Sequence, residues 1–91
     1  MDWLVAFGEA VRAERRRHGW TQAQLAERAG LHHNYVSLVE RGNTAPALDT
    51  VVALADALGC RVSRLVAAAE ARLEPSESVR LPTNRPKQQG R

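Results

Sequence analysis

Polar side chains suited to recognition gather in one short stretch, GLHHNYVSLVERG, at residues 30–42. Val36 and Val39 have the spacing of an apolar stripe on one helix. At about 100° per residue, the polar side chains of that helix fall opposite the stripe: Asn34, Ser37 and Arg41. An amide donates and accepts at once, a hydroxyl does either, and a guanidinium binds anionic oxygens. The stretch therefore predicts a helix with one buried face and one face suited to polar contacts.

Residues that support catalysis or metal binding are too sparse for either activity. His32 and His33 are adjacent and point about 100° apart on a helix, so they cannot grip one zinc ion as residues four apart can. Cys60 has no base or oxyanion donor at a recognisable spacing. The sequence therefore predicts no enzyme, no metal site and no cofactor.

Length and charge favour a small binding module. The chain has 91 residues, 44% of them hydrophobic, which suffices for one compact domain but is short for a closed active site. Residues 1–73 hold nine Arg and eight Asp or Glu, a net of +1, and residues 74–91 hold four Lys or Arg and two Glu, a net of +2. This balance is compatible with a polyanionic partner. The apolar run 3–7 is too short for a membrane span and lacks a signal peptide's flanks, so we expect a cytoplasmic protein with no membrane partner.

Helical periodicity and stop signals predict five helices in residues 1–73. We expect helices at Trp3 to His18, Gln22 to Ala29, from an N-cap at His32 to a stop at Gly42, Leu48 to Leu58, and from an N-cap at Ser63 to about Leu73. Thr21 and Gln24 have the spacing of a capping box, and Leu48 begins the expected buried stripe of the fourth helix. Residues 74–91 are rich in proline and polar residues, so we expect a flexible, disordered, basic tail. The predicted fold class is an all-α, compact five-helix bundle with this tail.

Two short helices joined by residues 30–32 have the helix-turn-helix arrangement, whose second helix enters the DNA major groove in the proteins that use it. The segments WTQAQLAERAGLHHNYVSLVERG and PALDTVVALADALGCRVSRL resemble the Xre/Cro-repressor helix-turn-helix family, which has a lambda-repressor-like DNA-binding domain. The resemblance covers about Phe7 to Val66. It implies a transcriptional regulator, acting as a repressor or autoregulator, that binds a palindromic operator in double-stranded DNA as a homodimer.

The resemblance also implies roles for individual residues. It places the readers of DNA base edges on the third helix: His33, Asn34, Ser37 and Leu38. It places DNA backbone contacts at the start of the second helix and around the third: Gln22, Tyr35, Arg41, Asn43 and Thr44. Arg15 and Glu40 match the arginine and glutamate that the family pairs across the motif. His32 stands where Ser or Thr is usual, and Leu38 stands where a polar reader is common.

The sequence leaves alternatives open on three points: the role of the fifth helix, the role of the polar face of the third helix, and the function of the domain. An apolar stripe on the fifth helix either closes the core or forms a dimer seam: Leu65, Val66, Ala69 and Leu73. The polar side of the third helix is either a DNA-reading face or solvated helix surface. The same helical domain also suits an antitoxin-like module that holds a small protein partner through its last helix or its tail.

Overall fold

Five helices make up residues 2–73, the part of the chain that the computed structural model describes. They are α1 (Trp3–Arg17), α2 (Gln22–Ala29), α3 (His33–Glu40), α4 (Leu48–Leu58) and α5 (Val62–Arg72), and no strand occurs within this range. The predicted all-α fold is confirmed. The expected disordered tail, residues 74–91, lies outside the described residues, as does residue 1.

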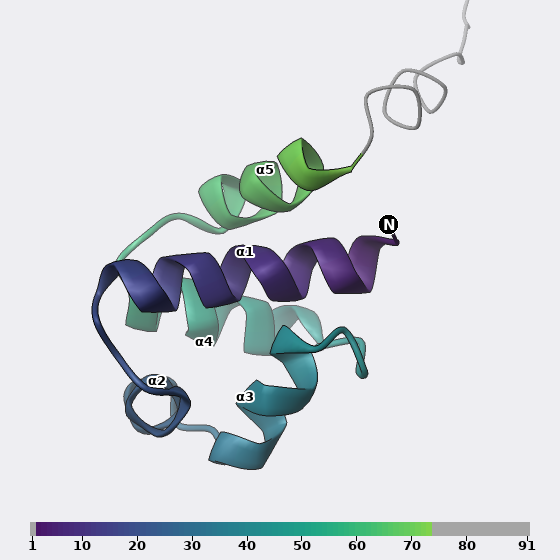
Figure 1. Cartoon of the computed structure of the whole chain (residues 1–91). Helices are drawn as coiled ribbons and strands as arrows, with labels where there is room; N and C mark the ends of the chain where they lie inside the picture. The colour runs from purple at the N-terminus through teal and green to yellow at the C-terminus, as the bar shows by residue number, and fades with distance from the viewer. Residues whose placement is uncertain (1, 74–91) are drawn as a thin grey trace, which may run out of the picture.

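Helix α1 runs through the middle of the domain, with α5 above it and α2 and α3 below it in the view of Figure 1. The largest fully buried side chains come from all five helices: Val11, Leu25, Val36, Val39, Leu54 and Leu65. Burying one leucine or valine side chain stabilises a domain by about 1.5–3 kcal/mol. Helices α2 and α3, with eight residues each, are too short to be stable alone, so this shared core holds them.

Helix α2 begins at a side-chain cap and ends in a glycine turn that leads to α3. Thr21 accepts a hydrogen bond from the Gln24 N–H at 3.1 Å, and the Gln24 side chain accepts one from the Thr21 N–H at 2.8 Å, which confirms the predicted capping box. Gly30 ends α2 in a left-handed conformation, with φ of 71°. The Leu31 N–H then donates to the Ala26 carbonyl at 2.8 Å. This closed turn brings α3 in at a defined angle.

Helix α5 begins earlier than the sequence predicts. Its N-cap is Arg61, with extended backbone and no side-chain hydrogen bond to the first turn, whereas Ser63 lies within the helix. The turn that ends α4 closes at Cys60, whose N–H donates to the Ala55 carbonyl at 3.0 Å. Only Arg61 separates this turn from the first residue of α5, Val62. The prediction of Ser63 as the cap is therefore wrong.

The apolar residues of α4 and α5 are used differently from expectation. Leu48, expected in the core, is 75% exposed, because α4 becomes buried only from Leu54 onward. Val52, one turn after Leu48, is 41% exposed. On α5, which packs along α1, three of the four stripe residues are buried in the core of the chain itself: Leu65, Ala69 and Leu73. Core closure therefore accounts for these three rather than a dimer seam, and only the half-buried Val66 remains from that set.

Helices α1 and α3 lie in close backbone contact at Gly8. A Cβ atom at Gly8 would lie 2.6 Å from the Glu40 carbonyl oxygen and would also clash with the Val39 carbonyl. A second close approach occurs at Gly42, where φ is 73° and a Cβ atom would lie 2.9 Å from the Val5 Cα. A residue with a side chain fits neither position, so the two glycines let the carboxyl end of α3 rest on the α1 backbone.

We expect Gly8→Ala to destabilise the protein, because the added methyl group would push the α3 backbone away from α1. Overpacking of this kind costs about 1–3 kcal/mol, and it outweighs the gain of up to about 1 kcal/mol in helix propensity. Urea unfolding measures the change. Arg12→Ala, at an exposed position of the same helix, is the matched control and should change the free energy of unfolding by less than about 0.5 kcal/mol. A Gly8→Ala protein as stable as the control would contradict the close crossing.

Candidate nucleic-acid interface

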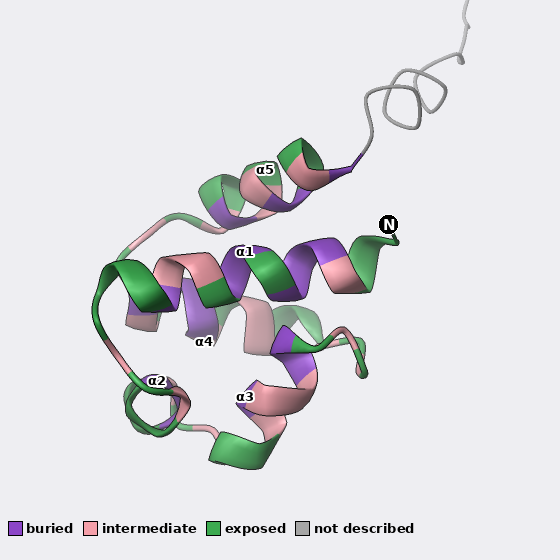
Figure 2. Cartoon of the chain, viewed as in Figure 1, coloured by how far each residue is buried: buried purple, intermediate pink, exposed green. Residues whose placement is uncertain are grey.

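The first turn of α3 is exposed to solvent, and the face that carries Val36 and Val39 is buried. Val36 and Val39 are 0% and 1% exposed, as their spacing predicts. Figure 2 shows the exposed first turn of α3 at the foot of the molecule and buried positions nearer to α1. The helix therefore projects from the domain with its carboxyl end anchored.

A histidine cap defines the start of α3. The His32 Nδ1 accepts a hydrogen bond from the Asn34 N–H at 3.1 Å, so this ring nitrogen carries no proton when the cap is formed. The rings of His32 and His33 stack with their centroids 4.8 Å apart. This pair stands in for the usual Ser or Thr cap, and it holds the His33 ring at the exposed end of the helix.

The four residues predicted to read base edges lie on the outward side and along the flanks of α3. His33 and Asn34 are exposed, and Ser37 and Leu38 are half-buried. Within residues 2–73, neither the side-chain amide of Asn34 nor the side-chain hydroxyl of Ser37 forms a hydrogen bond; the bonds at these residues involve only their backbone atoms. These polar groups are therefore available to an external partner.

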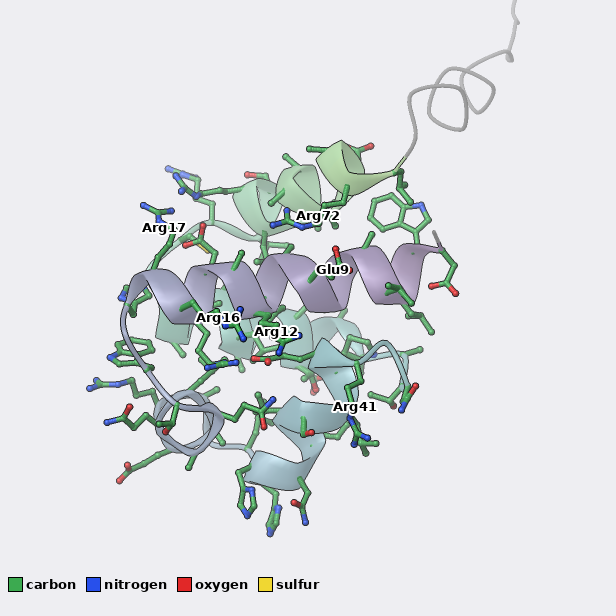
Figure 3. The ribbon with its side chains drawn as sticks, in the orientation of Figure 1. Glu9, Arg12, Arg16, Arg17, Arg41 and Arg72 are labelled. Atoms are coloured by element: carbon green, nitrogen blue, oxygen red, sulfur yellow. The ribbon has the colours of Figure 1, made fainter. Side chains whose placement is uncertain are left out.

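Most of the residues predicted to contact the DNA backbone gather at the other end of α3. Arg41 lies beside α3 (Figure 3), is exposed, and donates through Nε to the Ser37 carbonyl at 3.3 Å. Asn43 is exposed and Thr44 is half-buried in the loop that leads to α4. Tyr35 differs from these, because it is half-buried and packs against the core.

Gln22 lies in the first turn of α2, as expected, but its side chain already has an internal partner. Its Nε2 donates to Glu40 Oε1 at 3.0 Å. The side chain thus ties α2 to α3. The backbone N–H groups at the start of α2 still form the end of the helix that attracts anions.

A buried ion pair joins α1 to α3. The Arg15 Nε donates to Glu40 Oε2 at 2.6 Å, and Nη2 donates to Glu40 Oε1 at 2.9 Å, which is the bidentate pairing that the resemblance implies. The side chains are 11% and 2% exposed. The Arg15 Nη1 also donates to the Trp20 carbonyl at 2.8 Å. The hydrogen bond to Glu40 raises the pKa of Arg15, burial lowers it, and charge attraction to Glu40 raises it further, so the guanidinium stays charged.

The turn between α1 and α2 holds a stack of side chains that sequence reasoning missed. The rings of His18 and Trp20 stack with centroids 4.2 Å apart, and the Arg28 guanidinium carbon lies 4.3 Å from the Trp20 ring centroid. The His18 Nε2 also forms a hydrogen bond with the Leu58 carbonyl at 2.8 Å. The available signal was a pair of aromatic rings flanking the glycine that ends the first helix. The stack fixes the turn that leads to α2.

Other kinds of site find little support in residues 2–73. Across that range, the His, Cys, Asp and Glu side chains do not assemble in groups of three or more that could hold a metal ion. None of the helices described there has both the length and the apolar character that a bilayer crossing requires.

The sequence profile described as helix-turn-helix matches residues 11–65, from the middle of α1 into α5. The chain belongs to the helix-turn-helix family. Its α2, the Gly30 turn and α3 all fall within the matched range, which confirms the Xre/lambda-repressor resemblance predicted from the sequence.

This helix-turn-helix chain is similar to a phage immunity repressor, to a control protein and to a restriction-modification controller protein. It is 42% identical over 62 residues to the immunity repressor protein of Bacillus phage phi105, which covers 68% of this chain and 43% of that repressor. It is 39% identical over 66 residues to control protein C.SmaI of Serratia marcescens, covering 72% of this chain and 79% of C.SmaI. The crystal structure of the restriction-modification controller protein C.AhdI from Aeromonas hydrophila matches with a TM-score of 0.67 and 39% identity, over 68% of this chain and 94% of C.AhdI. The chain thus spans less than half of the phage repressor and most of each controller protein.

We expect Glu40→Ala to lower the free energy of unfolding by about 3 kcal/mol, because it leaves the Arg15 charge buried without its partner. Chemical unfolding followed by circular dichroism measures the loss. Glu9→Ala is the matched control, because Glu9 is 47% exposed and lies 3.8 Å from the Arg72 Nε on the surface. Its effect should stay below about 1 kcal/mol. Equal stability of the two variants would show that the buried pair does not hold α3.

Proposed function

We propose that this helix-turn-helix protein is a transcriptional regulator that binds a palindromic operator in double-stranded DNA, in a sequence-specific manner and as a homodimer. Helix α3 carries this proposal. Its first turn exposes His33 and Asn34, while its other face is buried and its carboxyl end is fixed to α1 by the Arg15–Glu40 pair. A short helix held in this way fits the major groove, which admits an α-helix.

Base reading is assigned to the outward side chains of α3. The free amide group of Asn34 suits a bidentate contact with adenine, and the Ser37 hydroxyl suits several base edges. His33 stands in the first turn, the part of a recognition helix that points at the bases. Leu38 offers an apolar surface that suits the methyl group of thymine. Asn34 is the strongest candidate of the four, because it is exposed and its amide makes no internal hydrogen bond within residues 2–73.

Backbone contacts are assigned to the two ends of the motif. Arg41, Asn43 and Thr44 lie together after α3, where a guanidinium and two short polar side chains suit phosphate oxygens. At the start of α2, backbone N–H groups replace the Gln22 amide as the main phosphate donors, because that amide is bonded to Glu40. Tyr35 contributes only the part of its side chain that remains exposed.

The dimer contact is assigned to α4. Leu48 and Val52 are four residues apart, on one side of the helix, and are 75% and 41% exposed. Exposed apolar residues on one helix face form a surface that a second copy can cover around a two-fold axis. On a palindromic operator with half-sites one helical turn apart, the two subunits of such a dimer would present their α3 helices to successive major grooves, about 34 Å apart.

Repression is the mode of regulation that the relatives favour. The phi105 relative is an immunity repressor, and a further relative, 40% identical over 63 residues, is a competence pilus inhibition repressor of Acinetobacter baylyi. A small dimer on an operator that overlaps a promoter would act by excluding other proteins from that DNA.

We expect selection from a random duplex pool to return a palindrome with half-sites about one helical turn apart. On that operator, Asn34→Ala should weaken binding by about 1–3 kcal/mol and relax the preference at one base pair in each half-site. Arg41→Ala is the matched control, because a lost phosphate contact weakens all duplexes alike and lowers the salt slope by about 0.9 per contact. Titrations against selected and scrambled duplexes at several salt concentrations separate the two effects. Unchanged base preferences in Asn34→Ala would refute the assignment of the reader.

We expect Leu48→Ser to shift the dimer toward monomer. Operator binding should weaken by about tenfold or more, because a monomer binds through one recognition helix where the dimer uses two. Sedimentation at several protein concentrations measures the association. Val66→Ser is the paired variant, because Val66 is the remaining candidate on α5. If Val66→Ser alone dissociates the dimer, the contact lies on α5 and the assignment to α4 is wrong.

A further inference from the structure

A hollow of about 430 Å³ opens beside the carboxyl end of α1, where the connection from α4 to α5 passes it. Its volume lies within the range of about 300–1,000 Å³ that is usual for small-molecule sites. Arg17, which lines it, lies on the side of α1 that faces α5, whereas Arg41 lies beside α3 (Figure 3). The hollow is therefore separate from the face assigned to DNA.

Charge is concentrated around this hollow. Three arginines and one glutamate line it, a net of +2: Arg17, Arg61, Arg64 and Glu14. The rest of residues 1–73 contains six arginines and seven acidic residues, a net of −1. The net positive charge of this region is therefore concentrated at the hollow. A hollow with a net positive charge raises the local concentration of anions.

Glu14 positions two of these arginines. Its Oε2 accepts from the Arg17 Nη1 at 2.9 Å and from the Arg64 Nη2 at 3.3 Å. The Glu14 side chain is 13% exposed, whereas those of Arg17 and Arg64 are 63% and 56% exposed. One carboxylate oxygen thus draws two guanidinium groups together and leaves most of their N–H groups facing solvent. Arg61 is exposed and makes no ion pair within residues 2–73.

Cys60 also lines the hollow. Burial raises the pKa of the Cys60 thiol, the Glu14 charge raises it further, and Arg64 acts in the opposite direction. The thiol therefore stays protonated near neutral pH and serves as a small apolar wall beside Leu58. Recognition is left to the three guanidinium groups.

We infer that this hollow binds a small anion with two or more anionic oxygens, of the phosphate or dicarboxylate class. A guanidinium matches such groups through paired N–H donors, and three guanidinium groups around one hollow favour a doubly charged ligand over a singly charged one.

The fold supplies its own reporter for this site. His18 lines the hollow and stacks on Trp20 at 4.2 Å. Trp3 is the only other tryptophan of the chain, so Trp3→Phe makes Trp20 the sole emitter. An anion that settles beside His18 changes the surroundings of that ring and hence the emission of Trp20.

The test is a fluorescence titration of Trp3→Phe protein without DNA, with inorganic phosphate and, separately, with succinate, at constant ionic strength. We expect a saturable change with at least one of the two. Added Arg61→Gln and Arg64→Gln substitutions should weaken binding by about tenfold, since each exposed charge contact is worth up to about a factor of five.

Two control variants locate the anion. Arg12→Gln changes an exposed arginine on α1 outside the hollow, and Arg41→Gln changes the arginine assigned to DNA. Both should bind the anion as the parent does. Loss of binding in either control would overturn the inference, and so would the lack of a saturable change with both phosphate and succinate. Saturation with phosphate alone or succinate alone assigns the ligand class. DNA binding is measured separately by titration, so its outcome leaves this test unaffected.

Discussion

A buried ion pair between Arg15 on α1 and Glu40 on α3 fixes the orientation of α3. A charge in a protein interior is costly unless its partners satisfy it, and here each group is satisfied from more than one direction. The Arg15 guanidinium contacts both Glu40 oxygens and the Trp20 carbonyl, and Gln22 donates to Glu40 from α2. The network therefore connects α1, the turn after it, α2 and α3. An apolar pair of similar volume would also fill this space, but a bidentate pair accepts only a narrow range of orientations, which suits a helix that must be aimed.

The close backbone contact at Gly8 complements that pair. The ion pair fixes the direction of α3, and the missing side chain at Gly8 sets how near α3 lies to α1. Both constraints act on the carboxyl half of α3, so its first turn can be exposed without becoming loosely held. A recognition surface benefits from this arrangement, since side chains on a rigid element lose less freedom when they bind. The arginine-lined hollow near Cys60 lies away from this surface, which leaves room for a second ligand on a small domain.

Much of this arrangement could be predicted from the sequence, because its signals are local. The capping box at Thr21, the left-handed turn at Gly30 and the stripe of Val36 and Val39 each depend on neighbouring residues, and the structure forms all three. The Arg15–Glu40 pair spans 25 positions and followed from the family resemblance instead. Failures occurred where tertiary context decides. Periodicity predicts the apolar face of α4 but not the residue at which other helices begin to cover that face. The sequence therefore predicts Leu48 in the core, whereas the structure exposes it.

The same limit applies to the candidate site. Spacing identified Gln22 as a residue at the start of α2, but only the packing of α2 on α3 shows that its amide faces Glu40. The convergence of Arg17, Arg61 and Arg64 is likewise invisible in the sequence, because α1 and α5 meet there only in the fold.

A titration of ¹⁵N-labelled protein with the selected operator, followed through the amide chemical shifts, tests whether the exposed side of α3 meets DNA. We expect the largest shift changes on residues 33–38, on the loop 41–44 and on the first turn of α2, and only small changes on α5. If the largest changes instead fall on α5, and the α3 amides keep the chemical shifts of the free protein, DNA binds at another surface.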